Sequence, residues 1–207
     1  MTQNKYTLEH CIYSDSLLNK LEELNNNQIQ YKNEQVDITY IKKGLSFAKY
    51  YHGSQIRKSG EHYYSHPIIV AEMVAEKKFK EDVIIGALLH DTLEDTALTL
   101  NDIELEFSTR IAEIVDRLTR KIDPITNKKM SAGECLIQSF LLKDDDVTLI
   151  KMFDRFHNIS TINYMSKEKQ KRIIDETLRD FYIISSLKEY NLFLPNIVTS
   201  ECDNFLF

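Results

Sequence analysis

The spacing of the apolar residues constrains the fold of this chain more than any other feature of its sequence. Apolar side chains recur at helical intervals, and one segment places them at positions i, i+3, i+4 and i+7 as Ile111, Ile114, Val115 and Leu118. Only five glycines and three prolines interrupt the 207 residues, and no convincing strand pair or hairpin turn is present in the sequence. The sequence therefore predicts an all-α fold.

The same periodicity predicts a series of helices separated by polar breaks. They are expected at residues 14–25, 38–52, 67–77, 81–95, 100–106, 109–120, 131–143, 146–164 and 167–189. The break NNNQIQYKNEQ indicates that residues 1–35 form a polar, loosely attached N-terminal extension. We expect one domain over residues 36–194 and a C-terminal tail over residues 195–207.

Charge and composition limit the partners that we expect. The net charge of −6 argues against nucleic acid and against anionic membranes as partners. The longest apolar run, residues 83–89, is far shorter than the roughly 20 residues that span a bilayer. Three scattered cysteines and the absence of an apolar signal core near the N-terminus favour the cytoplasm. Nothing in the sequence indicates the oligomeric state.

The stretch GALLHDTLEDT, residues 86–96, ends an apolar helical segment on ionisable groups. These groups are His90, Asp91, Glu94 and Asp95. Burying ionised groups without partners costs several kcal/mol. Either the stretch is a solvated acidic helix end with His90 at its boundary, or a cation neutralises it. This stretch alone favours neither reading.

Two further stretches add candidate ligands. In RKSGEHYYSHP, His66 stands immediately before a helix that begins with proline, where it could also act as a simple cap. In VTLIKMFDRFHNIST, Asp154 lies among apolar residues, and Asn158 and Thr161 extend it into a polar stripe at positions i, i+4 and i+7. A carboxylate in such surroundings requires a partner.

Two histidines and two aspartates form a mixed nitrogen and oxygen donor set. Such a set suits Mn²⁺, Fe²⁺ or Zn²⁺, with water completing the coordination shell. Because no cysteine ligand is involved and positions are left for water, a catalytic metal is favoured over a structural one. Glu94 and Asp95 remain, and they are placed to exchange a proton with water near the ion.

Three motifs together resemble a known family. HGSQIRKSGEHYYSHP, GALLHDTLEDT and IKMFDRFHNIST, in this order and spacing, closely resemble the HD-superfamily hydrolase domain of the RelA/SpoT alarmone enzymes. The resemblance extends over residues 38–191. It implies an HD-domain helical bundle with a single metal-ion site. It also implies hydrolysis of the substrate guanosine tetra- or pentaphosphate, (p)ppGpp, to GDP or GTP and pyrophosphate.

The resemblance also implies a role for each matching residue. The ligands of one Mn²⁺ would be His66, His90, Asp91 and Asp154. The acidic pair that supports the attacking water would be Glu94 and Asp95. The residues next to the guanine base and the phosphates would be Arg57 and Lys58, and those lining the nucleotide pocket would be Tyr63, Asn158 and Thr161.

Three positions depart from the family pattern and leave alternatives open. His62 replaces a common proline, Phe153 a small residue and Ser160 an arginine. One alternative is an HD phosphohydrolase that acts on another nucleotide, such as NADPH. Another is a catalytically weak module that binds alarmone or a partner chain. The chain also ends without a synthetase domain, so we expect it to degrade alarmone and not to make it.

Overall fold

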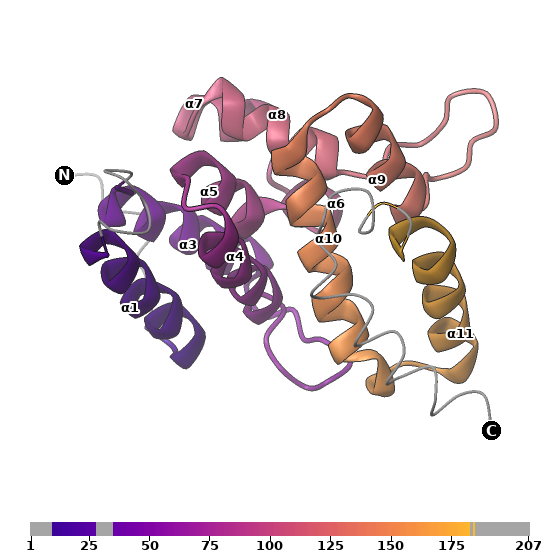
Figure 1. The fold of residues 1–207 in the computed structure, drawn as a ribbon, viewed down its shortest axis with the longest axis horizontal. Coiled ribbons are helices and arrows are strands. Elements are labelled where there is room, and N and C mark those ends of the chain that lie inside the picture. The colour runs from indigo at the N-terminus through magenta and orange to yellow at the C-terminus, as the bar shows by residue number, and fades with distance from the viewer. Residues whose placement is uncertain (1–9, 28–34, 183, 185–207) are drawn as a thin grey trace. The chain divides into compact units, whose positions relative to one another are not determined.

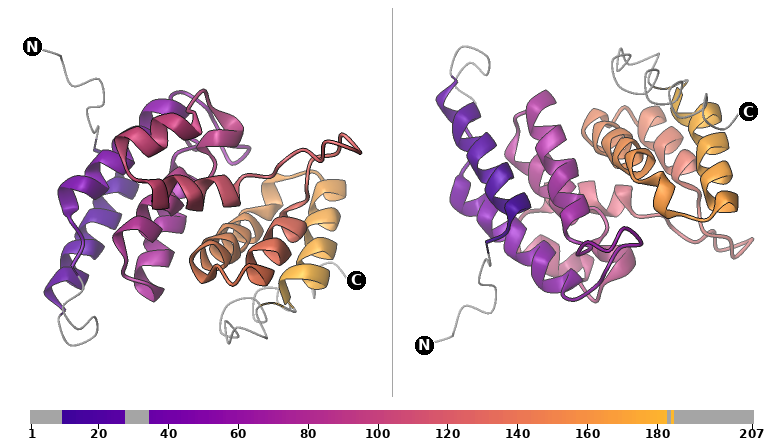
Figure 2. Two further views of the ribbon diagram at one scale, coloured as in Figure 1. Left: turned by 90° about the horizontal axis from the view of Figure 1, so that it is seen from above. Right: turned by 90° about the horizontal axis from the view of Figure 1, so that it is seen from below.

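The computed structural model describes residues 10–27, 35–182 and 184 (Figure 1). They belong to two compact units, Met1–Thr119 and Arg120–Phe207. In the described residues of each unit, helices are joined by loops, as the views from above and below show (Figure 2), and β-structure is limited to two isolated bridges. This part of the chain confirms the all-α prediction. None of its helices is long and apolar enough to cross a membrane.

The first unit is built around one apolar helix. Its elements are α1 (Ile12–Asn26), α3 (Ile38–His52), α4 (Ser65–Lys77), α5 (Glu81–Leu89), α6 (Thr92–Asp95), α7 (Leu100–Glu106) and α8 (Thr109–Leu118). Residues 83–89 of α5 are all buried, because α3, α4 and α8 pack around this helix. A helix that is apolar on all sides is typical of such a central position. All four apolar residues predicted to share one face of α8 are buried, as expected.

Helix α1 is packed against the rest of this unit. Leu17, Leu18, Leu21 and Leu24 are buried, and α1 contacts α3 and α4. The side chain of Asn25 bonds the backbone of Val36 through both its oxygen and its nitrogen, at 2.9 and 3.1 Å. Residues 12–26 of the expected N-terminal extension thus contribute to the core. The division of the chain at residues 35 and 194 remains a prediction, and residues 1–9, 28–34 and 185–207 lie outside the described residues.

The prediction of a single helix over residues 81–95 is wrong, because the helix is interrupted at His90 and Asp91. Helix α5 ends at Leu89 and α6 begins at Thr92. The His90 side chain bonds the carbonyl of Ala87 through Nδ1 at 2.8 Å, and the Thr92 hydroxyl donates to the carbonyl of Leu89 at 2.6 Å. These side chains thus satisfy the last carbonyls of α5 as hydrogen-bond partners, which allows the backbone to turn at the end of the helix.

The second unit contains α9 (Ala132–Leu141), α10 (Asp145–Ser160), a 3₁₀ turn (Ile162–Tyr164), α11 (Lys167–Glu176) and a π turn (Thr177–Phe181). Its core cluster consists of Leu136, Met152, Ile159, Ile162, Ile173, Phe181 and Ile184. The helix predicted for residues 146–164 therefore ends at Ser160, before the 3₁₀ turn. The helix predicted for residues 167–189 changes to the π turn after Glu176, and its last residues lie outside the described part.

A largely buried ion pair joins α10 and α11 in the second unit. Arg155 Nη2 lies 2.5 Å from Glu176 Oε2, and the N–H of Gly133 donates to Glu176 Oε1 at 3.0 Å. The Arg155 guanidinium also lies over the Phe181 ring, 4.3 Å from its centroid. Burial opposes the charged form of Glu176, but the charge of Arg155 and the bond from Gly133 prevail and lower the pKa of Glu176.

Gly86 allows α5 and α8 to approach closely. A Cβ atom at Gly86 would lie 2.5 Å from Ile114 Cγ2, far inside normal contact distance. We expect Gly86→Ala to destabilise the protein by about 1–3 kcal/mol, as overpacking does in other cores. Denaturant unfolding measures this change.

Gly44→Ala is the matched control for Gly86→Ala. Its added Cβ would lie 3.2 Å from a leucine methyl that can move, Leu88 Cδ1, while alanine is the better helix former. Gly44→Ala should therefore be clearly more stable than Gly86→Ala. Equal midpoints for the two variants would contradict the close approach of α5 and α8.

Candidate functional site

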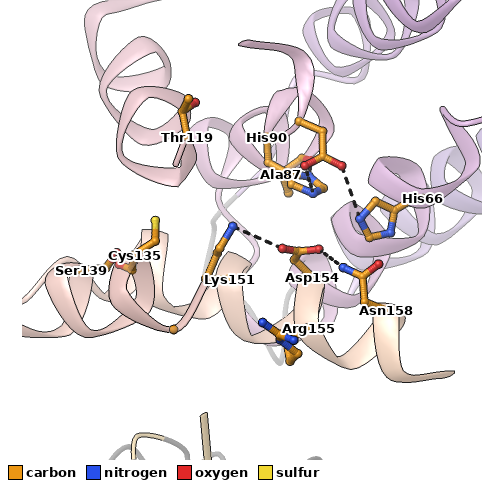
Figure 3. A network of polar contacts seen from close by, with 12 residues as sticks. His66, Ala87, His90, Thr119, Cys135, Ser139, Lys151, Asp154, Arg155 and Asn158 are labelled. Carbon is orange, nitrogen blue, oxygen red and sulfur yellow. Dashed lines mark hydrogen bonds and ion pairs between the residues drawn. The ribbon is translucent and has the colours of Figure 1, made fainter. Parts of the chain in front are cut away.

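The first unit brings three of the predicted ligands together. His66 is the second residue of α4, and His90 and Asp91 form the junction between α5 and α6. His66 Nε2 lies 3.6 Å from Asp91 Oδ2, and His90 Nε2 lies 3.2 Å from Asp91 Oδ1. One donor atom from each residue lies within 4.8 Å of the others, and both imidazoles are buried (Figure 3).

The hydrogen bond of His90 determines which of its nitrogens faces the aspartate as an acceptor. Since the carbonyl of Ala87 only accepts, Nδ1 carries the hydrogen and Nε2 of the neutral ring carries a lone pair. This lone pair faces a carboxylate oxygen of Asp91, which is also an acceptor. A cation between two such acceptors removes their repulsion. Two imidazole nitrogens and a carboxylate, with one ring held from behind, therefore fit a divalent metal ion.

Tyr63 connects this cluster with Asp95, one residue of the acidic pair. Its hydroxyl donates to Asp95 Oδ2 at 2.7 Å and lies 3.3 Å from Asp91 Oδ2. Asp95 is exposed and Glu94 is partly exposed, so both carboxylates can reach water. The sequence predicted Tyr63 as a residue that lines the nucleotide pocket. The structure places its hydroxyl on the carboxylates, a contact that the sequence did not indicate.

Arg57 and Lys58 lie on a tight loop that precedes Tyr63. The loop is closed by the N–H of Arg57 donating to the carbonyl of Glu61 at 2.8 Å, and Gly60 turns it with a positive φ of 91°. The Arg57 guanidinium lies 5.9 Å from the centroid of the Tyr63 ring. Arg57 is partly exposed and Lys58 exposed, so both side chains reach the solvent.

Sequence reasoning missed a bond from α1 to this loop. The Tyr13 hydroxyl donates to Glu61 Oε1 at 2.6 Å, across 48 positions of the chain. Ser59 Oγ lies 3.3 Å from the other oxygen of Glu61. No local pattern signals a contact at such a separation. It fastens the N-terminal helix to the loop that carries Arg57 and Lys58.

The bond between Tyr13 and Glu61 predicts that the phenol of Tyr13 is an unusually weak acid. The hydrogen bond to Glu61, together with burial, raises the pKa of Tyr13 to about 12. Because folding raises this pKa above the unfolded value of about 10, the bond stabilises fully below pH 10 and is lost as the pH rises towards 12. Ultraviolet titration of phenolate absorbance should show a tyrosine that titrates near pH 12 and that Tyr13→Phe removes. Glu61→Gln should move this titration to lower pH, and an unchanged titration would contradict the bond.

In the second unit, the carboxylate of Asp154 is held through both oxygens. Lys151 Nζ lies 3.4 Å from Oδ2, and Asn158 Nδ2 donates to Oδ1 at 2.5 Å (Figure 3). Lys151 was not predicted, although its position three residues before Asp154 on a buried helix offers the missing counter-charge. Thr161 donates to the carbonyl of His157 at 3.1 Å at the end of α10. The grouping of Asp154 with the other three ligands remains a prediction, as do the nucleotide contacts of Asn158 and Thr161.

The three departures from the family pattern each have a local place. Phe153 is buried, and the Ser160 hydroxyl donates to the carbonyl of His157 at 2.8 Å. The ring of His62 is stacked on Tyr64 with centroids 5.0 Å apart. None of these three departures replaces a residue of the cluster formed by His66, His90 and Asp91.

Two known proteins share sequence with this chain. A GTP pyrophosphokinase of Myxococcus xanthus is 38% identical over 152 residues, covering 70% of this chain and 20% of that protein. A guanosine-3′,5′-bis(diphosphate) 3′-pyrophosphohydrolase of Aquifex aeolicus is 40% identical over 141 residues, covering 67% and 20%. The chain thus spans about a fifth of the length of these relatives.

A solved structure and a family match complete the comparison. The structure of a metazoan ortholog of SpoT, described as hydrolysing ppGpp, has a TM-score of 0.55 and 21% identity, and the match covers 68% of this chain and 86% of that one. This likeness supports the fold. Residues 44–183 match the HD domain. The chain therefore belongs to the HD-domain family.

Proposed function

We propose that this chain is a metal-dependent (p)ppGpp 3′-pyrophosphohydrolase. The observation that carries the proposal is the His66, His90 and Asp91 donor cluster, joined through Tyr63 to the exposed carboxylate of Asp95. It is supported by the relative from Aquifex aeolicus, which is named for this reaction. We also propose that the protein is located in the cytoplasm, and that neither nucleic acid nor a membrane is its partner.

The metal that we propose is a single Mn²⁺ held by His66, His90, Asp91 and Asp154. Asp154 is included because of the family resemblance and because its carboxylate is oriented by two neighbours, as ligating carboxylates commonly are. When bound, the ion would supply a Lewis acid that polarises a phosphoryl oxygen and makes water more acidic.

In the proposed reaction the oxygen of water bonds to the phosphorus attached to the ribose 3′ oxygen. The bond between that phosphorus and the 3′ oxygen breaks, and pyrophosphate and GDP or GTP are released. A carboxylate of the Glu94 and Asp95 pair accepts the proton of the attacking water, and the 3′ oxygen takes up a proton as it leaves, which restores the ribose hydroxyl. The Tyr63 hydroxyl keeps the Asp95 carboxylate in one orientation for this transfer.

The remaining predicted residues would bind the substrate. Several negative charges approach a protein whose net charge is −6, so local cations are needed. Arg57 and Lys58 supply them, and the flat guanidinium of Arg57 can also stack on a purine. Asn158 and Thr161 are proposed as further contacts to the nucleotide.

The deciding experiment incubates the purified chain with ppGpp in the presence of Mn²⁺ or of a chelator. We expect GDP and pyrophosphate in equal amounts with Mn²⁺ and neither product with the chelator. Turnover of another nucleotide, such as NADPH, with intact ppGpp would replace the proposed substrate. Tight ppGpp binding without turnover would instead establish a binding module.

A further inference from the structure

We propose that His52 and Gln55 are positioning residues that fix the end of α6, and with it Asp95, for proton transfer. The inference rests on the proposed function above. Neither residue belongs to the predicted site. Both precede the loop of Arg57 and Lys58, and they connect the end of α3 with α6.

His52 is a buried ring with two defined contacts. It is the last residue of α3 and is 1% exposed. Its ring is stacked on that of Tyr63, with centroids 4.8 Å apart and planes inclined by 25°. Its Nδ1 lies 3.0 Å from Oε1 of Gln55. His52 thus supports from behind the same tyrosine that holds the Asp95 carboxylate.

Gln55 continues the connection to the backbone of α6. Its Nε2 donates to the carbonyl of Asp95 at 2.8 Å. Because the amide nitrogen is used there, the oxygen Oε1 is the group that faces His52, and Nδ1 of His52 must carry the hydrogen. Burial lowers the pKa of His52, which keeps the ring in this neutral form. The direction of each hydrogen bond is therefore determined.

Asp95 is consequently held at two points. Tyr63 binds its carboxylate and Gln55 binds its carbonyl, and both partners rest on the His52 ring. Helix α6 has only four residues and few internal bonds, so these outside contacts decide where its acidic side chains lie. We call the contacts of His52 and Gln55 with Tyr63 and Asp95 the brace. Loss of this brace should affect proton transfer more than substrate binding.

Gln55→Ala tests the brace with little risk to folding, because Gln55 is exposed. Gln138→Ala, at an exposed position of α9, is the matched control. Amide hydrogen exchange of residues 92–96 should accelerate about two- to tenfold in Gln55→Ala, the effect of one lost hydrogen bond, and stay unchanged in the control. With ppGpp and Mn²⁺, kcat should fall about ten- to a hundredfold with KM and Mn²⁺ affinity unchanged.

Two substitutions of His52 separate its contacts. His52→Asn keeps a donor near the place of Nδ1 but loses the ring on Tyr63, so kcat should fall, though less than in Gln55→Ala. His52→Phe keeps the ring on Tyr63 but loses the donor, and it should resemble Gln55→Ala. The reverse order of these two variants would contradict the hydrogen-bonded brace.

The exchange measurement decides the inference independently of the reaction. Unchanged exchange in Gln55→Ala would overturn the brace, whether or not the protein hydrolyses ppGpp. Faster exchange with an unchanged kcat would show a structural contact without a positioning role, which also overturns the inference. If the unmodified protein leaves ppGpp intact, the proposed function fails, and with it the positioning role for that reaction, while exchange still reports whether the brace exists.

Discussion

Replacing Asp91 with asparagine is expected to abolish both Mn²⁺ binding and alarmone hydrolysis. The two oxygens of Asp91 face the Nε2 atoms of His66 and His90, at 3.6 and 3.2 Å. Asparagine removes the negative charge and turns a donating NH₂ group towards one imidazole or the metal. We expect the Mn²⁺ affinity and kcat to fall by more than about a hundredfold, the upper range for residues that only support a ligand.

Calorimetric titration with Mn²⁺ and pyrophosphate release measure the two effects of Asp91→Asn separately. Asp175→Asn, which changes an exposed carboxylate on α11, is the control and should leave both unchanged. Asp154→Asn belongs in the same series, and a similar loss of Mn²⁺ affinity would support its assignment as the fourth ligand. Full Mn²⁺ affinity in Asp91→Asn would refute the cluster as the metal site.

The fold of this chain could be predicted from its sequence where burial alone determines it. The continuous apolar run of α5 and the periodic apolar face of α8 are visible in the sequence because the side chains that form them must leave water. The break between α5 and α6 has a different origin. It depends on side-chain bonds from His90 and Thr92 to the backbone carbonyls of α5, and such bonds leave no trace in hydrophobic periodicity.

The candidate site, too, was predicted only in part from the sequence. His66, His90 and Asp91 were predicted because their chemistry is unusual for the positions that they occupy, and the first unit brings them together. The bonds that orient the acidic residues were not predicted. Tyr63 reaches Asp95 across 32 positions and Gln55 reaches it across 40, so both contacts arise from the way the segment between α3 and α4 packs against α6.

Arg155→Met is expected to destabilise the second unit strongly. It leaves the carboxylate of Glu176 without its closest cation, in a position where the Glu176 side chain is only 16% exposed. Removing one partner of a buried ion pair typically costs about 3–5 kcal/mol. Denaturant unfolding should show this loss. Arg110→Met breaks a largely exposed pair with Glu113 and should change stability by less than about 1 kcal/mol.

The double variant Arg155→Met with Glu176→Leu tests whether the loss is due to the uncompensated charge. Apolar side chains in place of both charges should recover most of the stability, because no member of the pair is then left ionised and buried.

The pH dependence of the stability provides a second test of this ion pair. Since folding lowers the pKa of Glu176, the pair stabilises above the ordinary value of 4.5, and this contribution is lost as the pH falls through the folded-state pKa. Arg155→Met should therefore lose less stability on acidification than the unmodified protein, and an equal loss would show that the ion pair is not its source.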